Sequence, residues 1–457
     1  MSVILLNNIK SSTRIGILGG GLTGLTIAFC LKQKACKKFG VEVLEKDYEC
    51  GGLLKSFKKD GFTFDYGGAH IIYSRDKKAV DFMLDILGQN YFRKRRNNKI
   101  HFKGCFVKYP FENGLSDLPK QDNFECLYHY LNNNHRPKPT NFKEWIYHTF
   151  GKGVAEKYLI PYNEKIWNYP TEKMSLHWVE GRVPKPPVED VIKSALGIST
   201  EGYTHQLYFY YPRRGGIQAL IKGMENKVSN IVKNFEVKKV VKQKGEWIVS
   251  DGKTNKRYDL LISTIPIFDL ISALDKVPAR IRRALEGLKY NSLITVMLGL
   301  KGNNLPNFTA VYFPDPEVKF NRIAFPRVFS GYNAPSGKSS LVAEITTREN
   351  DSFWKTDDKK IAQEVIGNLH KRKLITKESV CFTQVRRSKY AYVIYDQDYQ
   401  KNIKPVRGFV SRLGIRLCGR FSEFEYLNMD ACVERGINLA KTIDEKLKKN
   451  PKKMGTL

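Results

Sequence analysis

A glycine-rich segment near the start of the chain has the residue types and the spacing that bind a pyrophosphate. Gly19, Gly21 and Gly24 follow an apolar stretch, Ile15–Leu18, which indicates a short buried strand. The first glycine permits a tight turn, the second lets backbone N–H groups approach a ligand, and the third lets a helix pack closely on the strand. The N-terminus of that helix adds partial positive charge. The segment therefore predicts a dinucleotide-binding loop, with a glycine-rich turn that holds no ligand as the alternative.

An acidic residue stands where the ribose of such a ligand would lie. The helix is expected to run through Leu31, and Val41–Glu45 indicates a second buried strand that ends in the acid. Glu45 can accept hydrogen bonds from both hydroxyl groups of an adenosine ribose. This strand–helix–strand order predicts a parallel sheet, but it does not by itself separate FAD from NAD.

The composition is that of a soluble globular protein. The 457 residues are 42% hydrophobic and 27% charged, and this length predicts roughly three domains or one domain with large insertions. The longest charge-free apolar run, Ile15–Leu31, is interrupted by glycines, so no integral membrane segment is expected. The first ten residues lack the basic and long apolar regions of a signal peptide, so a cytoplasmic location is expected.

The chain is strongly basic, with 77 Lys and Arg residues against 46 Asp and Glu residues and a formal net charge of +31. Only two runs are dense, Arg93–Arg96 and the tail around Lys446–Lys453. Neither is interleaved with aromatic residues as in proteins that bind single strands. Both are therefore interpreted as solvated surface, with no nucleic-acid partner. The net charge instead predicts attraction of anions, such as a phosphorylated substrate or cofactor.

The cysteines do not suggest a metal site. None of the eight lies in a CxxC pair or near histidines at zinc spacing. They are expected to be mostly buried, reduced thiols, and no metal is expected.

The middle of the chain has a helical pattern. Asn141 followed by Glu144 indicates an N-cap with its capping residue. The helix is expected to end at Gly151, and a second one to begin near Val154 and stop by Pro161.

Strand-like patterns follow at 235–262, 292–327 and 341–347, and helical spacing returns from Met429 to Leu447. No internal repeat or low-complexity linker is visible, which favours domains formed by insertion into one fold. The predicted segments are 1–80 (dinucleotide-binding, first part), 81–200 (helical insertion), 201–285 (dinucleotide-binding, second part), 286–405 (antiparallel sheet) and 406–457 (dinucleotide-binding, last part, with a C-terminal helix).

Further motifs resemble the flavoprotein superfamily that includes amine oxidases, protoporphyrinogen oxidases and UDP-galactopyranose mutases. A second glycine pair precedes Leu53, a glycine-rich stretch runs from Gly61 to Gly68, and Gly419-Arg420-Phe421 resembles the closing segment of that superfamily. The stretch Leu260–Pro266 matches it as well. The resemblance implies an α/β fold: a Rossmann-like FAD-binding domain with a helical insertion and a mainly antiparallel β-sheet insertion.

Several collinear segments narrow the resemblance to UDP-galactopyranose mutases, and it covers nearly the whole chain. They are Tyr109–Asn113, Pro161–Trp167, Lys173-Met174, Trp178–Val183, Pro212–Gly216, Phe320–Ile323 and Tyr426–Asp430. In that family the reduced flavin attacks the anomeric carbon of the sugar through N5 and expels the nucleoside diphosphate. The resemblance implies FAD in its reduced form, a nucleotide-sugar substrate, most suitably UDP-galactopyranose, and UDP-galactofuranose as product. NADPH and NADH are both candidate reductants, and a homo-oligomer is left open.

The resemblance also assigns roles to residues. Arg182 and Arg322 would each place a planar guanidinium on the leaving diphosphate, and the backbone of His70 would face the flavin. Matching substrate-binding positions are Tyr109, Tyr158, Asn163, Trp167, Gln206, Tyr312, Tyr392 and Tyr426. Matching cofactor-binding positions are Gly19, Gly21, Leu22, Thr23, Gly24, Glu45, Gly51, Gly52, Leu53, Gly68, His70, Val237, Gly419, Arg420, Tyr426, Asn428 and Met429.

Several points stay open in the sequence. Tyr395 competes with Tyr392 for one role, Glu112 replaces the glutamine of eukaryotic members, and Asn428 replaces the aspartate of bacterial members. The alternative function is an FAD-dependent oxidase or desaturase of the amine oxidase or protoporphyrinogen oxidase type, which gives no reason for a pair of diphosphate-binding arginines.

Overall fold

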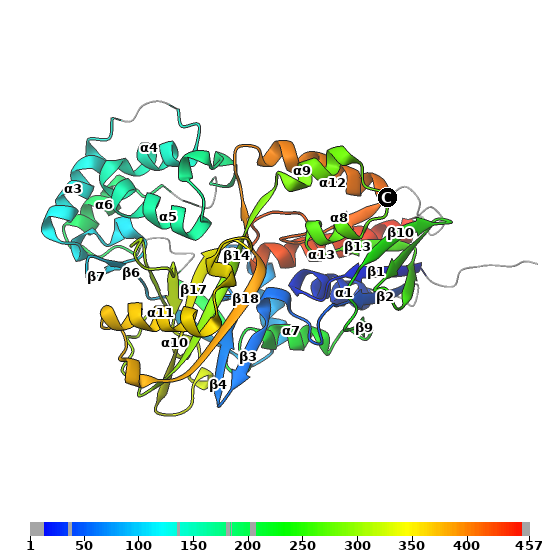
Figure 1. Ribbon diagram of the computed structural model, residues 1–457, viewed down its shortest axis with the longest axis horizontal. Helices are drawn as coiled ribbons and strands as arrows, with labels where there is room; N and C mark the ends of the chain where they lie inside the picture. Colours follow the sequence, from blue (N-terminus) through cyan, green and yellow to red (C-terminus); the bar gives the residue numbers. More distant parts are fainter. Residues whose placement is uncertain are drawn as a thin grey trace, which may run out of the picture. The chain divides into compact units, whose positions relative to one another are not determined.

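The computed structural model forms two compact units (Figure 1). It describes residues 13–34, 39–134, 138–179, 183, 185–201 and 207–449. Unit 1 comprises Met1–Gly52, Ile221–Leu285 and Ile403–Leu457, and unit 2 comprises Leu53–Leu220 and Glu286–Asn402. The assignment of functions to chain segments stays a prediction.

Unit 1 is built on a parallel sheet whose strands come from all three of its chain segments. The strand order is β19 (Ile415–Leu417), β13 (Leu260–Ser263), β1 (Thr13–Leu18), β2 (Phe39–Leu44) and β9 (Ile231–Val232). Ile15 and Ile17 of β1 are completely buried, which fits a central strand of a parallel sheet with both faces covered. The strand–helix–strand start predicted from the glycine loop is therefore confirmed.

Helices cover this parallel sheet. They include α1 (Leu22–Lys34), α8 (Ile267–Ala273) and α13 (Met429–Lys449). The C-terminal helix α13 was predicted from its spacing and is confirmed. It packs on α1 so closely that a Cβ built on Gly436 would lie 3.0 Å from Cγ2 of Thr26.

A small antiparallel sheet completes unit 1. Its strands are β10 (Lys239–Gln243), β11 (Glu246–Ser250) and β12 (Asn255–Tyr258). The first two strands correspond to the predicted pattern. The pattern did not identify β12, because only its last residue, Tyr258, is apolar enough to be buried.

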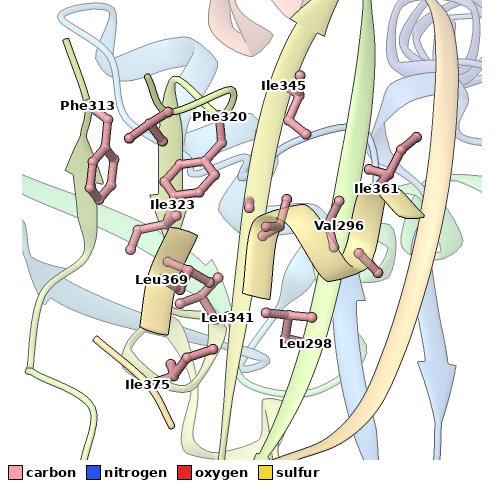
Figure 2. Close-up of a cluster of buried hydrophobic side chains, with 14 of the residues drawn as sticks. Val296, Leu298, Phe313, Phe320, Ile323, Leu341, Ile345, Ile361, Leu369 and Ile375 are labelled. Atoms are coloured by element: carbon pink, nitrogen blue, oxygen red, sulfur yellow. The ribbon is translucent and has the colours of Figure 1, made fainter. Parts of the chain in front are cut away.

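Unit 2 is centred on a mixed, mainly antiparallel sheet. Its strand order is β18 (Val380–Ile394), β14 (Lys289–Lys301), β17 (Lys338–Thr347), β16 (Arg322–Ala324), β15 (Ala310–Tyr312), β6 (Asn98–Phe102) and β7 (Cys105–Lys108). Within the described part of this sheet, β15 and β6 form the only parallel pair. Figure 2 shows the core of this unit, in which Ile361 and Leu369 of α11 (Asp358–Lys371) belong to one buried cluster with Val296 and Leu341 of the sheet.

A group of helices follows β7. They are α3 (Lys120–Leu131), α4 (Phe142–Val154), a π-helical turn (Ala155–Leu159), α5 (Ile160–Trp167) and α6 (Val188–Ala195). The predicted N-cap is confirmed, since Asn141 Oδ1 accepts a hydrogen bond from the N–H of Glu144 at 3.0 Å.

Of the helix ends predicted in this region, the one at Gly151 is confirmed and the one at Pro161 was wrong. At Gly151 the backbone leaves the helical region, with a φ of 70° and a ψ of 169°, so one helix ends there and the next begins just after it. Pro161 lies in the first turn of α5, where its missing N–H costs no hydrogen bond, so the helix continues to Trp167.

The remaining elements complete the two units. They are β3 (Ser56–Lys59), β4 (Phe62–Asp65), α2 (Lys77–Leu87), β5 (Tyr91–Arg95), β8 (Tyr208–Pro212), α7 (Gln218–Glu225), α9 (Ala279–Glu286), α10 (Pro326–Phe329) and α12 (Tyr399–Leu413). Among the described residues, no helix combines the length and the apolar composition needed to cross a bilayer. The predicted α/β fold class is confirmed.

Candidate functional site

The glycine loop of unit 1 has three glycines with three different physical requirements. Gly19 adopts a φ of 99°, which side chains rarely tolerate. A Cβ on Gly24 would lie 2.0 Å from the carbonyl oxygen of Gly19, so only glycine fits there. A Cβ on Gly21 would meet no atom within 4 Å. Neither packing nor backbone strain thus explains Gly21, whereas a ligand lying against the loop would.

Glu45 fixes the loop from the end of β2. Its buried carboxylate accepts hydrogen bonds from Gly20 N at 2.7 Å and from Asp47 N at 3.0 Å. The second glycine pair lies against the first, because Gly51 N donates to Gly20 O at 3.0 Å. The structure thus brings together two glycine segments that are about thirty residues apart, as the pyrophosphate hypothesis requires.

Val237 belongs to the same end of the sheet. Two residues before it, the N–H of Phe235 donates to the carbonyl oxygen of Glu45 at 2.9 Å. The segment that carries Val237 is therefore hydrogen-bonded to Glu45, the residue expected to bind the ribose. This position suits the predicted contact of Val237 with the adenine.

The closing segment of the chain also reaches this loop. Gly419 has a φ of 101°, and a Cβ there would lie 2.7 Å from Oγ1 of Thr23, at the start of α1. The guanidinium of Arg420 lies 4.4 Å from the ring centre of Tyr426 and donates to the carbonyl oxygen of Leu427 at 2.9 Å. Asn428 and Met429 lead from there into α13.

An ion-pair network that the sequence did not reveal holds this segment. Glu423 accepts from Gly419 N at 2.7 Å and from Arg435 at 2.7 Å. Arg435 also binds Glu425 at 2.6 Å, and Arg407 binds Glu425 at 2.8 Å. Burial raises the pKa of Glu423, although the N–H of Gly419 and the two arginines oppose this. The residues of unit 1 thus fit a dinucleotide: the backbone of the glycine loop would face the pyrophosphate, and Glu45 would face the ribose.

The predicted substrate residues of unit 2 form an aromatic cluster. Tyr312 contacts Tyr109 and Tyr162, with ring centres 5.0 and 5.5 Å apart. Tyr162 stacks on Tyr158 at 5.3 Å, and Tyr158 stacks on Phe111 at 4.9 Å. Burial raises the pKa values of Tyr109, Tyr158 and Tyr162, so these phenols stay neutral donors.

Arg322 joins this cluster through the register of three neighbouring strands. Tyr312 of β15 pairs with Arg322 of β16, which in turn pairs with Glu344 of β17. Side chains directly opposite one another share a face of the sheet. Residues distant in the sequence therefore form one row, as a consequence of the strand pairing.

The guanidinium of Arg322 is held by a carboxylate that the sequence analysis missed. Nη2 donates to both oxygens of Glu344 at 2.7 Å, and Nε donates to Oε1 at 3.1 Å. Burial lowers the pKa of Arg322, but Glu344, Tyr392 and Tyr312 raise it by more, so the arginine stays charged. A single glutamate among the apolar residues of β17 was the signal that could have identified Glu344, because a buried carboxylate needs a partner.

Glu344 also links Arg322 to the segment expected to face the flavin. Its Oε1 accepts a hydrogen bond from the N–H of Ala69 at 2.9 Å. Beside it, Nδ1 of His70 lies 2.8 Å from the carbonyl oxygen of Gly68. Since a carbonyl only accepts, Nδ1 carries the proton, and the histidine ring is used to hold its own turn.

Tyr392 and Trp167 lie beside this row, whereas Tyr395 does not. The ring of Trp167 is 6.0 Å from that of Tyr392, and Tyr392 is near enough to Arg322 to help raise the pKa of the guanidinium. Tyr395 instead packs on Tyr399 with ring centres 4.4 Å apart. The geometry thus favours Tyr392 for the role that the sequence left open.

Other predicted residues are engaged locally or belong to the other unit. Asn163 donates to Leu159 O at 2.7 Å and accepts from Trp167 Nε1 at 3.2 Å, so it stabilises its own helix. Tyr426 belongs to unit 1, whereas the other predicted tyrosines belong to unit 2. Arg182 and Gln206 lie outside the described residues.

Comparison with known sequences identifies the family. The pattern of the family described as flavin containing amine oxidoreductase matches residues 22–444. The chain is 21% identical to coproporphyrinogen III oxidase of Bacillus subtilis over 92% of its own length and 95% of that protein. It is 42% identical to a 4,4'-diapophytoene desaturase (4,4'-diaponeurosporene-forming) of Staphylococcus haemolyticus, but only over 66 residues, which cover 14% of this chain and 13% of the desaturase.

Solved structures support the same assignment. The fold is similar to that of a reduced UDP-galactopyranose mutase, with a TM-score of 0.86 and 25% identity over 94% of this chain and 95% of that one. It is also similar to a protein described as a protoporphyrinogen oxidase from Exiguobacterium, with a TM-score of 0.77 and 19% identity over 95% and 99% of the two chains. The family match implies that the dinucleotide is FAD, and the chain belongs to the flavin-containing amine oxidoreductases.

Proposed function

We propose that the protein is an FAD-dependent mutase that interconverts the pyranose and furanose forms of a nucleotide sugar, most suitably UDP-galactopyranose and UDP-galactofuranose. The observation that carries the proposal is the row of Tyr312, Arg322 and Glu344 in unit 2. The mutase is also the solved structure with the higher TM-score of the two compared above.

Arg322 suits the recognition of a leaving diphosphate. Its bonds to Glu344 use Nε and Nη2, so Nη1 remains to donate to a phosphate oxygen. The carboxylate orients the guanidinium before substrate arrives, and such preorganisation lowers the cost of stabilising charge that develops during the reaction. Arg182 stays the predicted second donor.

The tyrosines suit the remainder of such a ligand. Buried phenols that stay neutral can donate to phosphate oxygens without adding charge. The hydroxyl of Tyr312 is held by Asn98 Nδ2 at 3.2 Å, which limits its orientation. Of the stacked rings from Phe111 to Tyr162, Phe111 and Tyr158 are buried, so the partly exposed ring of Tyr162 is the one that can offer an aromatic face to a base.

When bound, reduced FAD would supply the nucleophile for the sugar. The chain would hold it through the glycine loop, Glu45 and the segment after Gly419. Hydrogen bonds from Ala69 to Glu344 and from Arg322 to Glu344 would keep the flavin-facing segment and the diphosphate donor in a fixed relation within unit 2.

A second candidate, an FAD-dependent oxidase or desaturase, is favoured by one observation. The alignment with coproporphyrinogen III oxidase covers nearly the full length of both proteins. An oxidase would bleach its oxidised flavin on addition of substrate and recover in air, whereas a mutase would act only after the flavin is reduced.

The test is an anaerobic assay of the FAD-loaded protein with UDP-galactofuranose, with and without dithionite, followed by chromatography of the nucleotide sugars. We expect UDP-galactopyranose only in the reduced sample. Equal conversion by the oxidised protein would reject the reduced-flavin mechanism. No conversion in either sample, together with bleaching of the oxidised flavin by a porphyrinogen, would reject the mutase in favour of the second candidate.

A further inference from the structure

The chain leaves the sheet of unit 2 directly after Tyr312, the last residue of β15. Phe313, the next residue, is completely buried, and a buried carbonyl group beyond the end of a strand needs a donor from elsewhere. The side chain of Lys165 provides it. Its Nζ donates to the carbonyl oxygen of Phe313 at 2.9 Å and to that of Asp315 at 2.7 Å. The segment 313–315 is thus attached to helix α5.

Helix α5 reaches the end of β15 with a second side chain. Tyr162 lies three residues before Lys165, so both side chains lie on the same face of the helix. The rings of Tyr162 and Tyr312 meet edge to face, with centres 5.5 Å apart. This ring contact does not fix the backbone that follows Tyr312. The two hydrogen bonds of Lys165 do so, because they hold two carbonyl groups at once.

Two further contacts hold the segment 313–315 from other elements. Arg372, the C-cap residue of α11, forms an ion pair with the carboxylate of Asp315. The ring of His101, on β6, stacks on Phe313 with centres 5.3 Å apart. The segment is therefore held by the sheet, by the end of α11 and by α5. Of these three, α5 is the helix that carries the candidate base-binding ring.

We propose that Lys165 is a positioning residue of the candidate substrate site: it holds the segment 313–315 so that the hydroxyl of Tyr312 keeps its place. Asn98 Nδ2 donates to that hydroxyl at 3.2 Å, so the phenolic proton remains for a ligand. The inference rests on the proposed function, in which this proton goes to a phosphate oxygen. A misplacement of about 1 Å in such a group can cost a factor of about 100 in rate.

The charge of Lys165 affects how firmly it holds the segment. Burial lowers the pKa of the ammonium from 10.5 to about 7; Asp315 opposes this, whereas Arg372 and Lys319 lower the pKa further. Hydrogen bonds from a charged donor are roughly twice as strong as those from a neutral one. The attachment should therefore weaken as the pH rises through about 7. Burial also lowers the pKa of His101 from 6.5, so this ring is neutral above that pH.

The test combines Lys165→Met with Tyr312→Phe in a double-mutant cycle on the reduced, FAD-loaded protein. Lys165→Met keeps the length of the side chain and should lower kcat/KM about tenfold, mainly through kcat, because the phenol is misplaced in the transition state. Tyr312→Phe removes the phenolic donor and should cost about tenfold as well. If Lys165 acts through Tyr312, the double variant should lose about tenfold rather than about 100-fold.

Two variants separate positioning from a general effect of charge. Lys319→Met removes an exposed positive charge close to Lys165 and should change kcat/KM by less than about twofold. Lys165→Arg keeps a cation whose charge does not change in the range of interest. The ratio of wild-type to Lys165→Arg turnover should fall about threefold between about pH 7 and about pH 9, since other titrating groups affect both proteins alike.

Crystal structures of the FAD-loaded proteins give a readout that does not depend on turnover. In Lys165→Met we expect the hydroxyl of Tyr312 to lie about 1 Å or more from its wild-type position, with the parallel sheet of unit 1 unchanged. This readout separates the inference from the proposed function. A wild type that converts no nucleotide sugar would reject the mutase, whereas the positioning role would still be decided by the displacement of Tyr312.

Three results would overturn the positioning role. They are an unmoved Tyr312 in Lys165→Met, a double variant whose loss is the product of the two single losses, and a Lys319→Met variant that is as impaired as Lys165→Met. Should Lys165→Met fail to fold, the pH profile of Lys165→Arg decides instead. A ratio of wild-type to variant turnover that stays constant with pH would then reject the proposal.

Discussion

The two units prepare their binding groups in different ways. In unit 1 the candidate binding groups belong to the backbone. Gly19, Gly21 and Gly24 shape a loop, and Glu45 fixes it by accepting hydrogen bonds from backbone N–H groups. In unit 2 the candidate binding groups are side chains. Tyr312, Arg322 and Glu344 form a row because their three strands pair in one register. A backbone site tolerates little change of shape, whereas a side-chain site depends on the balance of buried charges.

The largest effect is expected in unit 2 from Arg322→Ala. The change leaves Glu344, whose side chain is 1% exposed, as a buried carboxylate without its cation. Removing one partner of such a pair costs about 3–5 kcal/mol of stability. Loss of a preorganised donor would also reduce turnover by about 10²–10³. Urea unfolding and the mutase assay measure the two effects.

A double variant separates these two effects. Arg322→Met/Glu344→Gln removes both charges and keeps similar volumes, so it should recover most of the lost stability. Turnover should remain low, because the diphosphate donor is still absent. Recovery of turnover in the double variant would mean that Arg322 matters only for folding.

In unit 1 the matching change is Gly24→Ala. Its new methyl group would lie 2.0 Å from the carbonyl oxygen of Gly19, and the backbone must shift to accept it. We expect a loss of about 3 kcal/mol in unfolding free energy and loss of bound FAD, seen as a missing flavin absorbance. Normal stability together with full FAD content would show that strand and helix do not need this close approach.

A buried acid of unit 2 predicts a dependence of stability on pH. Burial raises the pKa of Asp65 from 3.8 to about 6, although the N–H of Ile217 and the hydroxyls of Tyr211 and Ser56 oppose this. The folded protein then takes up a proton at a higher pH than the unfolded chain. Stability should therefore be highest below about pH 4 for this group and fall by about 2–3 kcal/mol as the pH rises through 6. Other groups titrate in the same range.

The variant Asp65→Asn isolates this contribution. Its amide oxygen can accept from Ser56 and Ile217 as the carboxylate does. The difference in unfolding free energy between the two proteins should change with pH between about 4 and 6, in the direction given above. A difference that is constant with pH would show that Asp65 titrates normally.

The smallest effect is expected from Gly21→Ala, which is the matched control for Gly24→Ala. A methyl group here meets no atom within 4 Å, so the stability of the apoprotein should change by less than about 0.5 kcal/mol. FAD affinity should nevertheless fall about tenfold, because the methyl group occupies the space for the pyrophosphate. Titration of the apoprotein with FAD measures this, and unchanged affinity would move the pyrophosphate away from this loop.

The contrast between the units also explains how much the sequence can predict. The glycine loop and Glu45 form a local pattern, so the spacing of the residues is enough to predict their geometry. Glu344 is different, because its partner Arg322 is 22 residues away and meets it only through the pairing of β16 with β17. The ring of Tyr208, which lies 4.0 Å from the guanidinium of Arg93, was missed for the same reason, since the distant strand β8 supplies it. Pro161 misled the helix prediction because its position within the first turn was not visible in the sequence.

The proposed mutase activity is tested most directly by approaching one equilibrium from both sides. Reduced, FAD-loaded protein is incubated without oxygen, in one sample with UDP-galactopyranose and in the other with UDP-galactofuranose. We expect both samples to reach the same ratio of the two sugars, with no net change in the redox state of the flavin. The account would be contradicted if neither nucleotide sugar were converted, or if a sugar product appeared only as the flavin was oxidised.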